Sequence, residues 1–531
     1  MRSIKRWAKV SAVLAAAALA LSACGGGSAD KKAGGSTGTK ASGELKVFAA
    51  YDTTNWNPSN TSSALAVGAN LQVVEGLYEF DFSKFKAHKA LAAEDEPTKV
   101  NDTTYEVKLR DGAKFSTGDA VSSKDVVSSY KRIVDGDKDS TGAVQPSSYA
   151  AFLTAISGIE AKDDSTVTIK LTHAIDNLKE RLALIKVVPS KATFDELTKM
   201  PVGSGPYKYD TITDTTQDLS VNEHYNGANP ATVSKIHYDN SRDATARLTA
   251  AVAGQTDVVE ALDPVGIEKV KAAGWEVKDA TAYGIAMMTF NTTKAPFKDK
   301  RVRQALLTAI DTQTMIKTAL NGAGKEPTSF LPDYNDQYKK AATQFSFDVA
   351  KAKKLLADAG VAAGTEISVL TTTDTWIAAM GPQIKQNFEA LGLKVNLNNV
   401  ASADLWNNNV AQGKFDVVVA PGDASVYGAD PGVLIKGWFF SELWMKDRFR
   451  LTESDPAGAK ALVDLMDKAD KATGDEAKAK WGEVQDMIAD QAALYPLAFH
   501  TLYTAYNPAK VSNLTPIGVT GLQLIGTKVS K

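Results

Sequence analysis

Apolar and polar residues alternate in several short segments of the first half of the chain. This alternation predicts β-strands at Glu44–Ala49, Thr104–Leu109 and Ser165–Leu171. In the second half, apolar residues instead recur at helical spacing. They predict one amphipathic helix of about five turns that begins after Asp299 and continues to Leu320.

A strand, a helix and a second strand are predicted between residues 367 and 397. The strands are Ile367–Leu370 and Val395–Leu397, and the helix between them runs from Met380 to a stop at Gly392. A further helix, from Asp348 to Gly360, precedes them. This order is a βαβ unit, which builds a largely parallel sheet.

One local pattern occurs twice, at Ala253–Val259 and at Gln412–Val419. In each copy a helix ends at a glycine, and an aspartate then opens a buried β-branched strand. Two such units far apart in the sequence predict two α/β lobes, each with its own sheet. A ligand would bind between the lobes, at the carboxyl ends of the strands.

The N-terminus has the features of an export signal. A basic segment without acidic residues precedes the apolar stretch Val10–Ala20, and Leu21-Ser22-Ala23-Cys24 closes it. The last four residues resemble a bacterial lipobox, which implies removal of residues 1–23 and lipidation of Cys24. Residues 24–42 are rich in Gly, Ser, Thr and Lys and predict a flexible tether. We therefore expect an exported protein, anchored by lipid to the outer face of the cytoplasmic membrane.

Composition and motifs argue against several functions. The 531 residues carry a formal net charge of −2, with no basic cluster outside the signal, so nucleic acid is not an expected partner. The five histidines are scattered, and neither an HExxH motif nor a Walker A loop is present. The sole GxSxG match, Gly34–Gly38, lies in the predicted tether. We expect no catalysis, no metal and no cofactor.

Several longer motifs follow one another after Gly43. They are Val74–Glu79, Tyr105–Gly118, Ser123–Val126, Pro201–Tyr207 and parts of the stretch from Asn291 to Asp311. In this order they resemble the extracellular solute-binding proteins of the oligopeptide, dipeptide and nickel importers, known as family 5. The resemblance extends from about Gly43 to the C-terminus.

The resemblance implies an α/β fold of the type II periplasmic binding proteins, with two hinged lobes and an inserted extra domain. It implies a discontinuous domain I (43–85, 202–284 and 502–531), a domain II insertion (86–201) and a domain III (285–501). Turn residues near Gly203, Gly205 and Pro206, and the crossing near Phe290, are compatible with a hinge.

The implied function is capture of a short peptide by hinged closure and its delivery to ABC permease subunits, by a chain expected to be monomeric. Alternatives are a peptide-sensing surface lipoprotein, or transport of a nickel chelate, an opine, haem or an oligosaccharide. An extracellular hydrolase is the least favoured alternative, because no pair of nucleophile and base can be named.

Peptide-binding members of this family hold the ligand's α-ammonium group with an aspartate that follows a domain III strand. The corresponding loop here carries Asp423, the first choice, and Asp430, the alternative, with Tyr427 between them. For either aspartate, the alternative to ligand binding is a structural role in which its side chain hydrogen-bonds to the backbone of the loop. No arginine can be assigned to a ligand carboxylate from the sequence.

Aromatic and amide side chains near the ends of predicted strands are candidate walls of the site. Packing in the core is the alternative for each tryptophan. The candidates are Tyr51, Trp56 and Asn57 after the first strand, Trp376 after Ile367–Leu370, Trp438 after the Asp430 loop, and Tyr283 near the crossing between lobes.

Overall fold

The computed structural model describes residues 41–61, 63–440 and 442–530. The export signal, Cys24 and the tether up to residue 40 lie outside the described residues. Within the described ranges, no helix is both long enough and apolar enough to cross a membrane.

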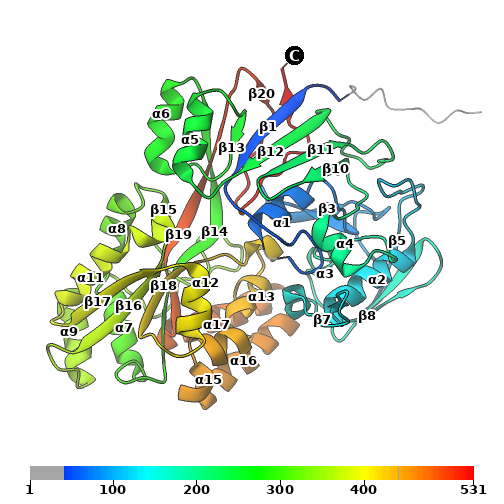
Figure 1. Ribbon diagram of the computed structural model, residues 1–531. Helices are drawn as coiled ribbons and strands as arrows, with labels where there is room; N and C mark the ends of the chain where they lie inside the picture. Colours follow the sequence, from blue (N-terminus) through cyan, green and yellow to red (C-terminus); the bar gives the residue numbers. More distant parts are fainter. Residues whose placement is uncertain (1–40, 62, 441, 531) are drawn as a thin grey trace, which may run out of the picture. The chain divides into compact units, whose positions relative to one another are not determined.

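An 11-stranded mixed sheet forms the centre of the fold (Figure 1). Nearly all its strands follow a single path, and β15 (Gly324–Lys325) pairs separately with β19. In order, the path contains β10 (Tyr207–Ile212), β11 (Thr216–Val221), β12 (Lys235–Asn240), β1 (Glu44–Ala49), β13 (Val258–Val259), β19 (Leu494–Tyr506), β14 (Glu276–Phe290), β18 (Val417–Gly422), β16 (Glu366–Thr372) and β17 (Lys394–Val400).

The prediction that each lobe has its own sheet is wrong. The long strands β14 and β19 pair with each other along most of their length, with β13 on one side and β18 on the other. With 15 and 13 residues respectively, they are long enough to continue through both halves of the sheet.

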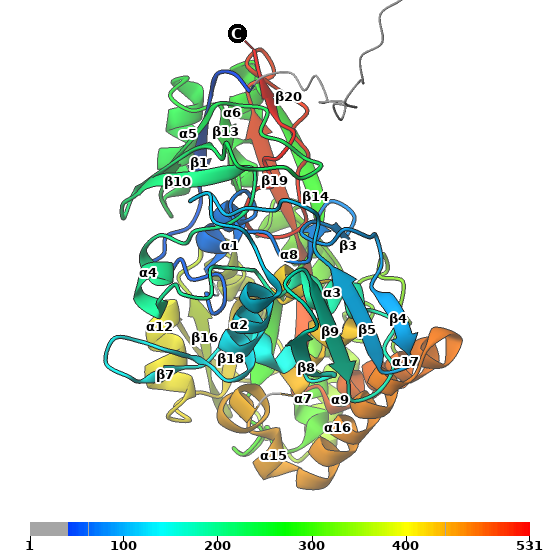
Figure 2. The same cartoon turned by 90° about the vertical axis from the view of Figure 1, so that its right-hand side faces the viewer.

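A smaller antiparallel sheet with the order β4-β5-β9-β8 lies apart from the central one (Figure 2). Helix α2 (Ser123–Val134), which follows β5 in the sequence, begins at a capping box formed by Ser122 and Asp125. The strands are β4 (Thr98–Asn101), β5 (Thr104–Lys108), β8 (Ile156–Ala161) and β9 (Thr166–Leu171), and two short hairpins join β2 (Tyr78–Asp81) to β3 (Lys86–Lys89) and β6 (Asp137–Lys138) to β7 (Val144–Gln145).

The predicted five-turn helix is in fact two helices, α7 (Lys300–Thr308) and α8 (Thr312–Thr318). Asp311 ends the pattern, because its carboxylate accepts a hydrogen bond from Thr314 N and caps a new helix at that point. The predicted Met380 helix is α11 (Gly381–Glu389), preceded by the short α10 (Thr375–Ala378).

The βαβ prediction is confirmed, since β16 is parallel to both β17 and β18. The repeated pattern also has a structural basis. Gly254 and Gly413 both adopt positive φ, and the aspartates that follow them accept hydrogen bonds from backbone amides of a neighbouring strand in the sheet. Asp257 bonds to Lys46 N and Asp416 to Ser368 N, at 3.0 and 2.8 Å.

The remaining helices cover the sheets and connect them. They are α1 (Ala64–Asn70), α3 (Leu178–Ala183), α4 (Phe194–Lys199), α5 (Ala244–Val252), α6 (Ile267–Ala272), α9 (Val349–Asp358), α12 (Ser402–Asp404), α13 (Pro431–Leu434), α14 (Lys436–Phe439), α15 (Leu451–Ser454), α16 (Pro456–Lys471) and α17 (Gly474–Gln491), with the 3-10 turns η1 (Ser148–Phe152), η2 (Pro264–Gly266) and η4 (Ser425–Tyr427), the π-helical turns η3 (Leu405–Val410) and η5 (Leu443–Arg448), and a last strand pair, β20 (Val511–Ser512) with β21 (Lys528–Val529).

The buried apolar side chains form several separate groups. One lies within residues 285–499, a second is built mainly from residues 71–187, and a third is built around β1 and β12. The second group also includes Val433, Ile517 and Val519, so it draws on segments outside the predicted insertion. The three predicted domains and their boundaries stay a prediction.

Candidate ligand-binding site

An irregularity in the pairing of β14 with β19 marks the middle of the large sheet. Thr281 pairs with Thr501 and Ile285 with Phe499, so residues 282–284 face only His500. Extra residues of this kind bend a strand and redirect its side chains. The Tyr334 hydroxyl donates a hydrogen bond to the Ala282 carbonyl oxygen at this bulge.

Asp423 lies beside the bulge, directly after β18. A Cβ atom placed on Gly284 would be 3.6 Å from Asp423 Oδ2. The other oxygen, Oδ1, accepts hydrogen bonds from Ser425 N and Ser425 Oγ, at 2.8 and 2.6 Å. Burial raises the pKa of the Asp423 carboxyl to about 6, although the Ser425 hydrogen bonds oppose the effect. Among the described residues, no cationic side chain forms an ion pair with it.

Tyr51 approaches this carboxylate from the end of β1. Burial raises the pKa of the Tyr51 hydroxyl, and the charges of Glu260 and Asp423 raise it further. The same carboxylate also contributes to the raised pKa of Tyr334, whose main cause is burial. Two tyrosines from distant segments therefore lie within electrostatic reach of Asp423.

Tyr283 and Trp438 line one small cavity next to the Asp423 loop. The cavity also touches Gly422 and Ala424, and its volume of about 10 Å³ is enough for a single water molecule. Trp438 is 8% exposed. The Tyr283 ring meets the Tyr334 ring edge-on at 5.3 Å, which extends the aromatic surface.

Trp376 stacks on the imidazole of His500, with ring centroids 4.2 Å apart and planes 7° apart. Trp376 lies in α10, just after β16, and His500 is the β19 residue that faces the bulge. Burial lowers the pKa of His500 to about 4, so its ring is neutral at pH 7. The pair presents an uncharged aromatic surface near Asp423.

Tyr427 and Asp430 contact the predicted domain II insertion. Tyr427 stacks on Phe152 at 4.8 Å, and Asp430 Oδ1 accepts a hydrogen bond from Arg181 Nη2 at 2.8 Å. The side chains of this ion pair are 5% exposed for Arg181 and 21% for Asp430. The structure thus gives Asp430 a cationic partner, whereas Asp423 has none among the described residues.

Comparison with known proteins identifies the family. The model of the bacterial extracellular solute-binding proteins, family 5 (middle region), matches residues 86–442. The chain belongs to this family. Family 5 proteins bind solutes rather than catalyse reactions, and they act outside the cytoplasm.

Individual relatives are similar along most of their length. Heme-binding protein A of Haemophilus influenzae is 28% identical over 400 residues, which are 70% of this chain and 71% of that protein. Di/tripeptide-binding protein 3 of Pseudomonas aeruginosa is 23% identical over 478 residues, 81% of this chain and 84% of the relative.

The fold is also that of solved binding proteins. The ABC transporter-associated periplasmic binding protein DppA of Helicobacter pylori, in complex with the peptide STSA, superposes with a TM-score of 0.79. The two chains are 21% identical, and the match covers 92% of this chain and 99% of that one. The predicted type II periplasmic-binding-protein fold is therefore confirmed.

Two predicted site residues of this family 5 protein lie inside the fold. Trp56 is 3% exposed and meets the Tyr209 ring edge-on at 5.7 Å. Asn57 is fully buried, and its Oδ1 accepts a hydrogen bond from Ser59 N. The structure does not bring either residue to Asp423, and their contact with a ligand stays a prediction.

Three residues near the site escaped sequence analysis. Tyr334 lies in a segment without regular secondary structure, and His500 lies in the middle of a strand, so neither has a local signal. Arg181 is one of many basic residues on short helices. Only the three-dimensional arrangement brings them to the Asp423 loop.

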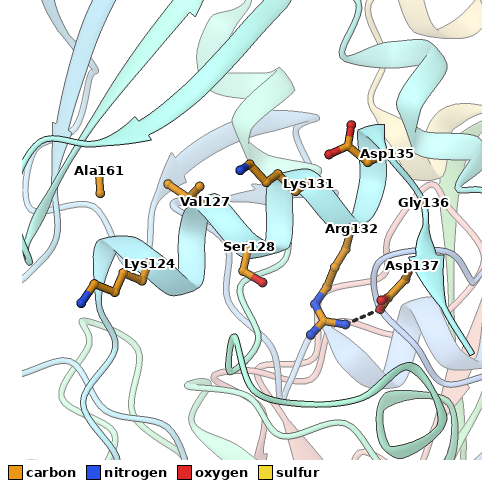
Figure 3. A pocket seen from close by; sticks show the side chains of 9 residues that line it. All are labelled: Lys124, Val127, Ser128, Lys131, Arg132, Asp135, Gly136, Asp137 and Ala161. Carbon is orange, nitrogen blue, oxygen red and sulfur yellow. Dashed lines mark hydrogen bonds and ion pairs between the residues drawn. The ribbon is translucent and has the colours of Figure 1, made fainter. Parts of the chain in front are cut away.

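A larger hollow lies elsewhere, along α2 (Figure 3). It measures about 430 Å³ but is open to solvent. Its arginine, Arg132, is already paired with Asp137 and with the Ala192 carbonyl oxygen. None of its lining residues belongs to the set around Asp423, so we do not place the ligand there. No group of side chains suited to a metal ion occurs among the described residues.

Proposed function

We propose that this family 5 protein captures a short peptide and holds its α-ammonium group on Asp423. The observation that carries the proposal is a recessed carboxylate that has no cationic partner in the described part of the chain and lies beside the bulge in the pairing of β14 with β19. An ammonium group next to this carboxylate would compensate for its desolvation and form a charge-assisted hydrogen bond.

The surroundings of Asp423 support a ligand with an apolar body. Tyr51, Tyr283, Trp376 and Trp438 supply aromatic surface around the carboxylate, and the neighbouring imidazole of His500 is neutral. Peptide-binding relatives share the fold. Because another relative is a haem-binding protein, haem is the main alternative ligand. Nickel chelates, opines and oligosaccharides are the other competitors.

The proposed role in the cell is based on the proposed peptide ligand. The protein would be a monomeric lipoprotein, held by a lipid on Cys24 at the outer face of the cytoplasmic membrane, that delivers peptide to an ABC permease. A peptide-sensing role would use the same site. Peptide uptake in a deletion strain distinguishes the two, because a transport role predicts its loss and a purely sensory role predicts its retention.

Thermal unfolding of the full chain, with and without candidate ligands, tests the proposal. Binding to the native state alone stabilises a protein by about 2.7 kcal/mol at a hundredfold excess over the dissociation constant. We expect stabilisation by di-, tri- or tetrapeptides that is lost in Asp423→Asn. Stabilisation only by haem, a metal chelate or a sugar would overturn the peptide assignment, and peptide binding that Asp423→Asn leaves intact would overturn the anchor.

A further inference from the structure

The short helix α13 joins two of the groups of buried apolar side chains. Val433 packs into the group built mainly from residues 71–187, whereas Leu434 belongs to the group within residues 285–499. The two side chains are buried, at 0% and 5% exposure. Helix α3, which contributes to the first of these groups, lies beside α13 (Figure 1). This contact connects the two halves of the molecule at the end of the loop that begins with Asp423.

Gly432, in the same short helix, leaves room for an arginine of α3. A Cβ atom placed on Gly432 would lie 2.6 Å from Arg181 Nη2. The same atom would lie 2.8 Å from Asp470 Oδ1 and 3.0 Å from Asp430 Oδ1. The Arg181 guanidinium therefore fills the place of the missing side chain, where it donates a hydrogen bond to Asp430 and lies close to a second carboxylate.

The charges around Gly432 balance only when Arg181 is present. Asp430 and Asp470 are largely buried, with side chains 21% and 16% exposed. Lys436, which is 6% exposed, pairs with Asp470 at 3.0 Å. In the described part of the chain, Arg181 is the only side chain that forms an ion pair with Asp430. Loss of Arg181 would leave the Asp430 carboxylate shielded from water and without a partner, which is strongly unfavourable.

We infer that Arg181, placed over Gly432, is a latch that holds the two lobes of this protein together. In the closed arrangement the latch neutralises Asp430 while both groups are shielded from water. Without Arg181, the same arrangement contains two recessed carboxylates that lack a cation, Asp423 and Asp430, and opening the lobes hydrates both. Removal of the arginine therefore favours the open form. The inference concerns the shape of the protein and does not depend on which ligand it binds.

Small-angle X-ray scattering of the full chain, with no ligand added, tests the latch. The variants are Arg181→Gln, which removes the charge, and Gly432→Ala, which keeps every charge but places a methyl group where the guanidinium lies. Gly432 does not adopt positive φ, so alanine fits its backbone. Both variants should have a larger radius of gyration than the wild type, because the lobes move apart. Arg181→Lys should expand the protein less than Arg181→Gln, since it keeps the positive charge.

Two controls make the same chemical changes beside the latch. Lys179→Gln removes a positive charge from α3, where Lys179 pairs with Glu96 rather than with the loop after β18. Gly437→Ala adds a methyl group at the same contact between the two halves, and its Cβ would lie an ordinary 3.6 Å from the nearest atom, in the ring of Phe152. Both controls should keep the wild-type radius of gyration.

The latch is refuted if Arg181→Gln and Gly432→Ala leave the radius of gyration unchanged, or if the controls expand the protein as much as these variants do. Circular dichroism and the thermal midpoint show whether each variant is folded, and Gly432→Ala serves as the test if Arg181→Gln does not fold. The proposed function is tested separately, because no peptide enters this experiment. Failure of the latch would leave peptide capture on Asp423 untouched.

Discussion

Replacing Asp423 by asparagine should make the unliganded protein more stable at pH 7. Burial raises the pKa of this carboxyl from 3.8 to about 6, which corresponds to about 3 kcal/mol against the charged form. The side chain keeps some contact with solvent, so we expect a gain of about 1–2 kcal/mol. Asparagine has nearly the same shape and can still accept the hydrogen bonds from Ser425.

The pH dependence follows from the direction of the shift. Because the folded pKa lies above the unfolded one, the folded protein binds more protons than the unfolded chain between about pH 4 and pH 6. Wild-type stability should therefore fall, through this residue, as the pH rises through that window. The advantage of Asp423→Asn should be complete near pH 7 and absent below about pH 4.

Urea unfolding of both proteins at pH 4 and pH 7 measures this difference. Asp163→Asn is the matched control, because Asp163 accepts the same two hydrogen bonds from Ser165 but lies on the surface, and its pKa is lowered. The control should not become more stable at pH 7. The reasoning is refuted if Asp423→Asn is less stable than the wild type at pH 7, or if its advantage does not change with pH.

The remaining predictions concern folding and ligand binding. Gly203→Ala should cost about 3 kcal/mol or more in urea unfolding, because an added Cβ would lie 2.0 Å from a backbone carbonyl oxygen, whereas Gly158→Ala, with no atom within 4 Å, should stay within about 1 kcal/mol. Arg110→Met should cost about 3–5 kcal/mol in the same assay, since it leaves Glu75 buried without its bidentate partner. Peptide affinity should fall about tenfold from pH 7 to pH 5 in titration calorimetry, because the ionised fraction of a carboxyl with a pKa of about 6 falls by that factor; equal affinity at both pH values would argue against this carboxylate as the anchor.

Local patterns predicted the local structure well. The strand Glu44–Ala49 has the predicted bounds, and the βαβ unit was found from the spacing of its apolar residues. The pattern failed where one side chain changes the geometry, as at Asp311, which starts a new helix within an unbroken apolar stripe. It also failed for the continuous sheet, because the sequence of β14 and β19 does not reveal that they pair with each other across more than 200 residues.

The candidate site was predictable only in part. Asp423 could be proposed because it directly follows a buried strand. Ligands of open α/β sheets bind at the carboxyl ends of the strands, and the order of elements in the sequence shows where those ends are. The packing of Trp56 in the core could not be distinguished from a role as a cleft wall, because both use an aromatic residue after a strand. The sequence also could not distinguish a ligand-binding Asp430 from one that forms an ion pair, because its partner Arg181 lies 249 positions away.

The loop after β18 connects the proposed ligand anchor to the contact with the predicted insertion. Asp423 begins this loop, Tyr427 stacks on Phe152 near its middle, and Asp430 pairs with Arg181 at its end. On the proposed function, moving the insertion onto this loop removes water from Asp423 before any ammonium group has reached it. That desolvation opposes closure of the empty protein and is offset once a cationic ligand is bound. A ligand shifts a conformational equilibrium only by its difference in affinity for the two states, and the Asp423 carboxylate supplies such a difference here.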